Sequence, residues 1–151
     1  MSQTLSNVLI HFVYSTKNRG VWLKDAGHRK ELYALKGKIL QDFDCHLILI
    51  NGVEDHVHIF CDFTRNYTIK KVIGELKTGT SKWLKTMGSQ YSDFHWQSGY
   101  GAFSVSQSKR PNLFRYVENQ EEHHRVMSYQ DEFRRLCELH GVAIDERYVW
   151  D

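Results

Sequence analysis

Two short segments of the chain carry residue types that could perform chemistry together. His56-Val57-His58 places two imidazoles at i and i+2, which share one face of a β-strand and could bind the same metal ion. Further along, Tyr116 and Gln120 lie at i and i+4, which is one face of a helix. Gln120 could add an oxygen ligand to the two histidines, and Tyr116 could act as a nucleophile. A two-histidine metal site beside a nucleophilic tyrosine is suited to cleaving a phosphodiester.

Each segment also has a plainer structural interpretation. With nine histidines in 151 residues a chance His-x-His pair is common, and an aromatic residue at helical spacing more often belongs to a core. Two other enzyme classes are excluded. Phe60 stands where a histidine-triad hydrolase needs a third histidine, and His58 stands where a His-x-Thr/Ser phosphoesterase needs a hydroxyl. His123 and His124 diverge by about 100° on a helix, so we expect them to contact DNA or to be structural.

The bulk composition sets limits without choosing a chemistry. A chain of 151 residues predicts a single domain over residues 1–151, and 41% apolar with 25% charged residues is typical of a soluble globular protein. A net charge of +2 permits a nucleic-acid partner without arguing for one. Three cysteines without paired spacing, a polar N-terminus and short apolar runs predict a cytoplasmic protein without a membrane partner.

Hydrophobic periodicity predicts an alternation of strands and helices. We expect strands over 8–14, 45–53, 56–62 and 99–106. We expect helices over 24–43, 68–87, 111–124 and 131–140. The order βαββαβ is the split βαβ pattern. It predicts an α+β fold with an antiparallel sheet of about four strands, helices on one face, and a C-terminal helix that carries Tyr116.

The predicted helix over 68–87 is rich in lysine, with Glu75 as its only acid. A solvated helix face is the usual interpretation of such a pattern. Beside a DNA-processing site, a phosphate-contacting surface is the better one. The predicted DNA-binding residues are Lys17, Arg19, Lys70, Lys71, Lys77, Lys82, Lys85, Lys109 and Arg110.

Three segments in this order resemble a known family. His56-Val57-His58, the strand over 99–106 and the segment over 116–124 are similar to the single-tyrosine HUH transposases of small insertion sequences. HUH stands for His-hydrophobic-His, and Val57 fills the middle place. The resemblance extends from the first strand, through Lys17 and Arg19, to His124. It implies no role for the residues after His124.

The resemblance implies roles for individual residues. Tyr116 would be the nucleophile, and His56, His58 and Gln120 would hold a divalent metal, Mg²⁺ or Mn²⁺, with no nucleotide cofactor. The substrate would be single-stranded DNA with hairpin ends. The protein would be a homodimer in which Tyr116 of one subunit serves the histidines of the other, in trans.

The residues agree with this chemistry. A tyrosine ionises near pH 10, so Tyr116 needs activation at neutral pH, which a divalent cation on the phosphate could assist. Attack would give a 5′-phosphotyrosine and a free 3′-OH, and imidazole ligands favour Mn²⁺ over Mg²⁺. Two alternatives stay open: a domesticated relative that acts on repeat hairpins, such as the tyrosine transposases associated with repetitive extragenic palindromes, and a non-catalytic module that binds single-stranded nucleic acid.

Overall fold

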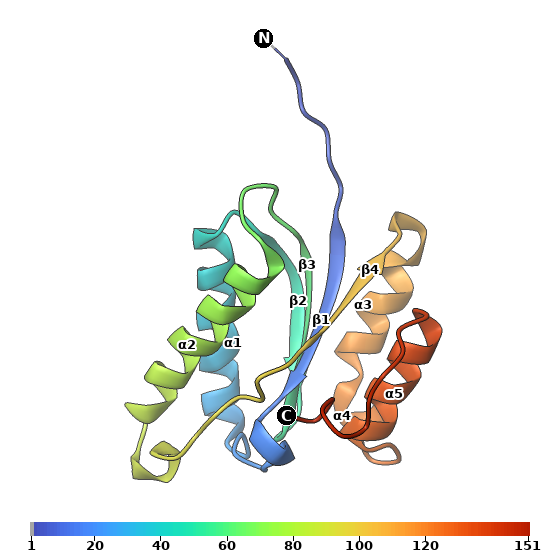
Figure 1. The fold of residues 1–151 in the computed structure, drawn as a ribbon. Helices are drawn as coiled ribbons and strands as arrows, with labels where there is room; N and C mark the ends of the chain where they lie inside the picture. The colour runs from blue at the N-terminus through green and yellow to red at the C-terminus, as the bar shows by residue number, and fades with distance from the viewer. Residues whose placement is uncertain (1) are drawn as a thin grey trace.

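The computed structural model describes residues 2–151, and its centre is a four-stranded antiparallel sheet (Figure 1). The strands are β1 (Leu9–Ser15), β2 (His46–Gly52), β3 (His56–Asp62) and β4 (Gly101–Val105). They lie in the order β2-β3-β1-β4, so the first strand of the chain is central and pairs with both β3 and β4. The α+β class and the antiparallel sheet predicted from the sequence are confirmed.

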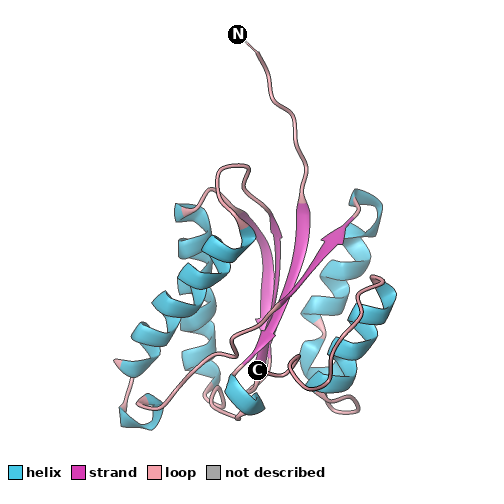
Figure 2. Ribbon diagram, viewed as in Figure 1, coloured by secondary structure: helices cyan, strands magenta, loops and turns pink. Residues whose placement is uncertain are grey.

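Helices cover both faces of this sheet (Figures 1 and 2). The helices are α1 (Ala26–Asp42), α2 (Ile69–Lys85), α3 (Arg110–Glu118), α4 (Gln120–His123) and α5 (Tyr129–Leu139). The expected helical layer is formed by α1 and α2. The opposite face, for which the sequence predicted no layer, lies under α3, α4 and α5. Among residues 2–151, no helix combines the length and the apolar composition that crossing a membrane requires.

Alternate side chains of β1 and β3 enter two different cores. Phe12, Tyr14 and Ile59 belong to the larger core, which is packed against α1 and α2. Val13 belongs to a smaller core with side chains of α5. Val13 is the direct register partner of His58, and the two side chains therefore share the face that α3 to α5 cover. Both cores need the sheet, which is why β1 is buried along its whole length.

The helix predicted over 111–124 is interrupted in the structure. Helix α3 ends at Glu118 and α4 begins at Gln120, with Asn119 between them at φ −95° and ψ 27°. Asn51 on β2 explains the interruption, because its Nδ2 donates to the carbonyls of Val117 and Glu118 at 3.0 Å each. These carbonyls would otherwise accept from the next helical turn. Tyr116 and Gln120 are therefore on successive short helices.

Candidate metal and nucleophile site

The two histidines of β3 are buried, and each has a hydrogen-bond partner at Nδ1. His56 Nδ1 donates to Asp55 Oδ1 at 2.6 Å. His58 Nδ1 lies 2.7 Å from Nε2 of His11 on β1. Both side chains are 0% exposed. A partner on one ring nitrogen fixes the orientation of an imidazole and leaves the other nitrogen for a ligand. In both residues that other nitrogen is Nε2.

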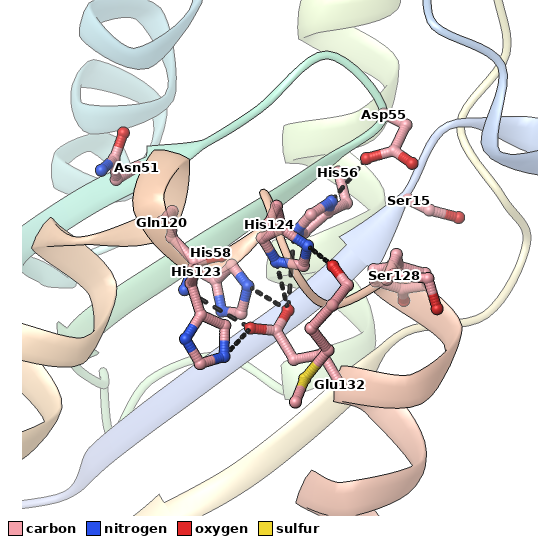
Figure 3. A network of polar contacts seen from close by, with 12 residues as sticks. Ser15, Asn51, Asp55, His56, His58, Gln120, His123, His124, Ser128 and Glu132 are labelled. Atoms are coloured by element: carbon pink, nitrogen blue, oxygen red, sulfur yellow. Dashed lines mark hydrogen bonds and ion pairs between the residues drawn. The ribbon is translucent and has the colours of Figure 1, made fainter.

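A single carboxylate on α5, that of Glu132, meets these Nε2 atoms (Figure 3). Glu132 Oε1 lies 2.9 Å from His58 Nε2, 3.1 Å from His124 Nε2 and 3.4 Å from His56 Nε2. Glu132 Oε2 lies 3.6 Å from His123 Nε2. Glu132 is 1% exposed, so the cluster is shielded from bulk water. One ligand atom from each of His56, His58, His124 and Glu132 lies within 4.8 Å of all the others, which is a group that could hold a metal ion.

The donor set fits a divalent cation. His124 Nδ1 donates to the carbonyl of Met127 at 2.7 Å, and His56 Nδ1 donates to Asp55. In the neutral form of each imidazole the Nε2 atom therefore carries a lone pair, which points toward Glu132. His56 Nε2 and Gln120 Oε1 are buried without a hydrogen-bond partner among the described residues. Buried polar atoms are normally paired. A cation bound beside the carboxylate would accept these lone pairs and give the buried atoms the partner that they lack.

The charges in the cluster are strongly coupled. Burial alone would raise the pKa of Glu132, but the charge of His58 and the hydrogen bond from His124 hold it well below its usual range. Burial would lower the pKa of His56, but its contacts with Asp55 and Glu132 raise it to about 9. Burial lowers the pKa of His58 to about 4. Glu132 is therefore ionised and attracts positive charge, a proton or a metal cation, to the surrounding Nε2 atoms.

Tyr116 adjoins the cluster from α3 of the same chain. Its hydroxyl donates a hydrogen bond to Glu132 Oε2, and its ring centroid lies 4.8 Å from that of His123. Burial, followed by the charge of Glu132, raises the pKa of Tyr116 above its ordinary range. Tyr116 and Glu132 line a cavity of about 650 Å³ together with His11, Ser104, Lys109, Asn112, Arg135 and His140. The phenol therefore lies at the wall of a cavity that His11 and His123 also line.

Gln120 opens α4 and is fully buried. Its Nε2 donates to the carbonyl of Tyr116 at 3.3 Å, which leaves Oε1 as the atom without a partner. The interruption at Asn119 has therefore not separated Gln120 from Tyr116.

The basic residues predicted to bind DNA lie on different sides of the sheet. Lys109 lines the cavity with Tyr116, and Arg110 follows it as the first residue of α3. Lys17 and Arg19 form the short helix η1 (Lys17–Arg19) after β1. The remaining five lie on α2, across the sheet from Tyr116 (Figure 1). They are Lys70, Lys71, Lys77, Lys82 and Lys85.

One of these lysines, Lys77, also has a structural role. Lys77 Nζ donates to the carbonyls of Gln97, Ser98 and Gly99 at 2.7, 3.1 and 2.8 Å. These bonds use all three ammonium protons. Burial lowers the pKa of Lys77 to about 8. Lys77 therefore ties α2 to the segment before β4, and its contact with DNA stays a prediction.

Sequence reasoning missed two residues of the cluster. Glu132 lies beyond the segments that resembled a known family, and a lone glutamate in an amphipathic helix gives no signal. His124 was set aside because consecutive helical residues diverge. In the structure α4 ends at His123, and the two histidines approach different oxygens of Glu132. Two consecutive residues of a continuous helix could not both approach one atom, but His123 and His124 lie at the end of a helix and approach two different atoms.

Comparison with known proteins now identifies the family. The family model described as "Transposase IS200 like" matches residues 4–120, most of the chain. The chain belongs to this family of transposases. The matched segment contains His56, His58, Tyr116 and Gln120 but ends before His124 and Glu132. A search of curated protein sequences gave no match.

Two solved structures share the fold of this IS200-like transposase. A protein from Deinococcus radiodurans, assigned as a transposase, superposes with a TM-score of 0.62 at 18% identity, over 80% of this chain and 95% of that one. A REP-associated tyrosine transposase bound to a REP hairpin superposes with a TM-score of 0.62 at 13% identity, over 82% of this chain and 74% of that one. At these identities the likeness is one of fold.

Proposed function

We propose that this IS200-like transposase cleaves and rejoins single-stranded DNA, with Tyr116 as the nucleophile. His56, His58 and Gln120 would hold a divalent cation, Mg²⁺ or Mn²⁺, and no nucleotide cofactor would be needed. The observation that carries the proposal is the convergence on Glu132. The Tyr116 hydroxyl and the Nε2 atom of His58 contact the two oxygens of the same carboxylate. The hydroxyl of the proposed nucleophile and an atom of a proposed metal ligand therefore contact the same carboxylate.

Residues of the chain itself would supply the nucleophile and orient it for attack on the phosphate. The Tyr116 oxygen attacks phosphorus, the bond from phosphorus to the 3′-oxygen breaks, and the products are a 5′-phosphotyrosine and a free 3′-OH. In the overall balance the phenol proton ends on the 3′-OH, and the hydrogen bond from the Tyr116 hydroxyl to Glu132 Oε2 orients the phenol before attack. A divalent cation, when bound, would neutralise the phosphate and stabilise the departing oxygen. A second 3′-OH can reverse the step, because the phosphotyrosine conserves the energy of the broken bond.

The substrate we propose is single-stranded DNA that carries a hairpin. One structural neighbour was solved with a REP hairpin bound, and a tyrosine that must reach a backbone phosphate suits an unpaired strand. Lys109, Arg110 and Arg135 would contact the phosphates of this strand, since Lys109 and Arg135 line the cavity beside Tyr116. Lys17 and Arg19, at the end of β1, would extend this surface.

Assembly as a homodimer with sites in trans is the arrangement that the sequence resemblance implies, and we keep it as a proposal to be tested. The contacts within one chain support the other arrangement. Tyr116 already donates to Glu132 of its own chain, and Glu132 contacts His58 of that chain. A site in cis needs no exchange of α3 between subunits.

The test is the formation of a covalent adduct. The protein is incubated with Mn²⁺ and a labelled pool of single-stranded oligonucleotides that carry a hairpin flanked by randomised sequence, and is then run on a denaturing gel. We expect a DNA-linked band that EDTA suppresses and that Tyr116→Phe removes while hairpin binding persists. Binding without an adduct in the wild-type protein would support the non-catalytic alternative and contradict the proposal.

A further inference from the structure

Glu132 is the one acidic side chain at the centre of the site, and the proposed function does not yet explain it. It lies on α5, outside the part of the chain that the family model matches. A carboxylate that is 1% exposed is rare unless it is paired or bound to a metal. Its two oxygens also face different partners: Oε1 faces the imidazoles of His58 and His124, whereas Oε2 accepts from the Tyr116 hydroxyl and lies 3.6 Å from His123 Nε2.

The distances around Oε1 are those of neighbouring ligands on one cation. Two atoms that each lie about 2.1 Å from a metal, at an angle of about 90 to 110°, are roughly 3.0 to 3.4 Å apart. Glu132 Oε1 lies 2.9, 3.1 and 3.4 Å from the Nε2 atoms of His58, His124 and His56. Hydrogen bonds alone do not account for all three contacts, since His56 Nε2 has no hydrogen-bond partner within residues 2–151.

The chemistry of the ligands points the same way. Two imidazoles and a carboxamide are neutral, whereas Mg²⁺ and Mn²⁺ prefer anionic oxygen ligands. Glu132 would supply the negative charge that the predicted set lacks. His124 would supply an imidazole whose Nδ1 is already fixed by the carbonyl of Met127.

We propose that Glu132 and His124 are further ligands of the divalent cation, and that the second carboxylate oxygen of Glu132 positions the Tyr116 hydroxyl beside it. This inference rests on the proposed function only for the presence of a metal. It makes Glu132 a direct link between the cation and the nucleophile. It also assigns to α5 a part of the site that the sequence motifs do not contain.

The test measures metal affinity, not DNA cleavage. Binding of Mn²⁺ to the metal-free protein is followed by calorimetry for the wild type and for Glu132→Gln, which keeps the shape of the side chain and removes its charge. We expect the Kd for Mn²⁺ to rise at least about tenfold in Glu132→Gln. The matched control is Glu138→Gln, an exposed glutamate on the same helix, which should leave the Kd unchanged. Tyr116→Phe should change the Kd by less than about twofold, because the phenol binds the carboxylate and not the metal.

Each outcome supports or overturns the proposal. The proposal is overturned if the wild type and Glu132→Gln bind Mn²⁺ with equal affinity while His58→Ala loses binding. It is also overturned if the wild-type protein binds no Mn²⁺. A higher adduct yield in Glu132→Ala would also overturn it, because Glu132 would then be blocking the site. Thermal unfolding in EDTA checks that each variant folds. If Glu132→Gln does not fold, Glu132→Asp, which withdraws the oxygens by one methylene, takes its place. If Mn²⁺ binding depends on Glu132 but no DNA adduct forms, the ligand assignment stands and the proposed function fails.

Discussion

His58 joins the central strand of the sheet to the last helix, because His11 contacts one of its nitrogens and Glu132 the other. We expect His58→Ala to reduce the Mn²⁺-dependent adduct to the level of Tyr116→Phe. The free energy of unfolding should fall by about 1–3 kcal/mol, since a buried carboxylate loses a donor. Denaturing gels and urea unfolding measure the two effects. His46→Ala is the control, because His46 is exposed on β2. Full activity of His58→Ala would remove His58 from the site.

Lys36 is a buried titratable residue on the opposite side of the sheet. Its Nζ donates to the Tyr14 hydroxyl and lies 4.3 Å from the centroid of a Trp96 ring. Burial, assisted by the charge of Lys77, lowers the pKa of Lys36 well below 10.5. Between that lowered pKa and 10.5, the folded chain binds fewer protons than the unfolded chain, so stability rises with pH across this window and levels off above it.

Replacement of Lys36 by Met should remove that pH dependence. We expect the slope of unfolding free energy against pH, from about pH 8 to about pH 10, to decrease by up to about 1.4 kcal/mol per pH unit. Urea midpoints at a series of pH values give the slope. Lys38→Met, a substitution of an exposed lysine on the same helix, should leave it unchanged. An unaltered slope in Lys36→Met would mean that Lys36 stays protonated in the folded chain.

At the scale of elements, the junction between α3 and α4 determines where the site residues lie. Asn51→Ala removes two hydrogen bonds to the carbonyls of Val117 and Glu118. We expect a loss of about 1–2 kcal/mol in unfolding free energy and a lower adduct yield, because the freed carbonyls allow α3 to continue and rotate Gln120 and His124. Asn66→Ala, a substitution of an exposed asparagine before α2, is the control. A stable and fully active Asn51→Ala would show that the junction needs no side chain to hold it.

The sequence predicted the elements better than their arrangement. Strand periodicity located β1 and β3 to within a residue or two, because buried β-branched and aromatic runs are strong local signals. The break at Asn119 could not be predicted, since its cause is Asn51, a residue distant in sequence. The layer of α3 to α5 was missed for the same reason. Alternate side chains of β1 and β3 place apolar residues on both faces of the sheet, but the sequence does not indicate which helices cover each face.

At the scale of the molecule, the sheet separates two basic surfaces. Lys109 lies beside Tyr116, whereas Lys82 on α2 lies across the sheet. We expect Lys109→Gln to weaken binding to single-stranded DNA and to reduce the slope of log K against log salt by about 0.7, the value for one phosphate. Lys82→Gln should change the slope less. Fluorescence anisotropy at several salt concentrations measures both, and a larger effect for Lys82 would place the strand on α2.

Subunit mixing tests how the site is assembled. Tyr116→Phe and the double variant His56→Ala/His58→Ala are each expected to be inactive. A trans site regains cleavage when the two are mixed, because one site of the heterodimer then has an intact tyrosine and intact histidines. Under the proposed trans arrangement we expect recovery, whereas a site completed by the contact of Tyr116 with Glu132 of its own chain gives none. Light scattering gives the oligomeric state, and tagged subunits verify exchange. Recovery of the adduct would establish the trans arrangement.

The central position of β1 has a consequence for synthesis of the chain. This strand, Leu-Ile-His-Phe-Val-Tyr-Ser, leaves the ribosome well before its partners β3 and β4 are made. For seconds at ordinary rates of elongation, an apolar strand with two unpaired edges is exposed in the nascent polypeptide. Such a segment pairs readily with copies of itself. Recovery of soluble protein should therefore depend on chaperones that shield β1 until β3 emerges.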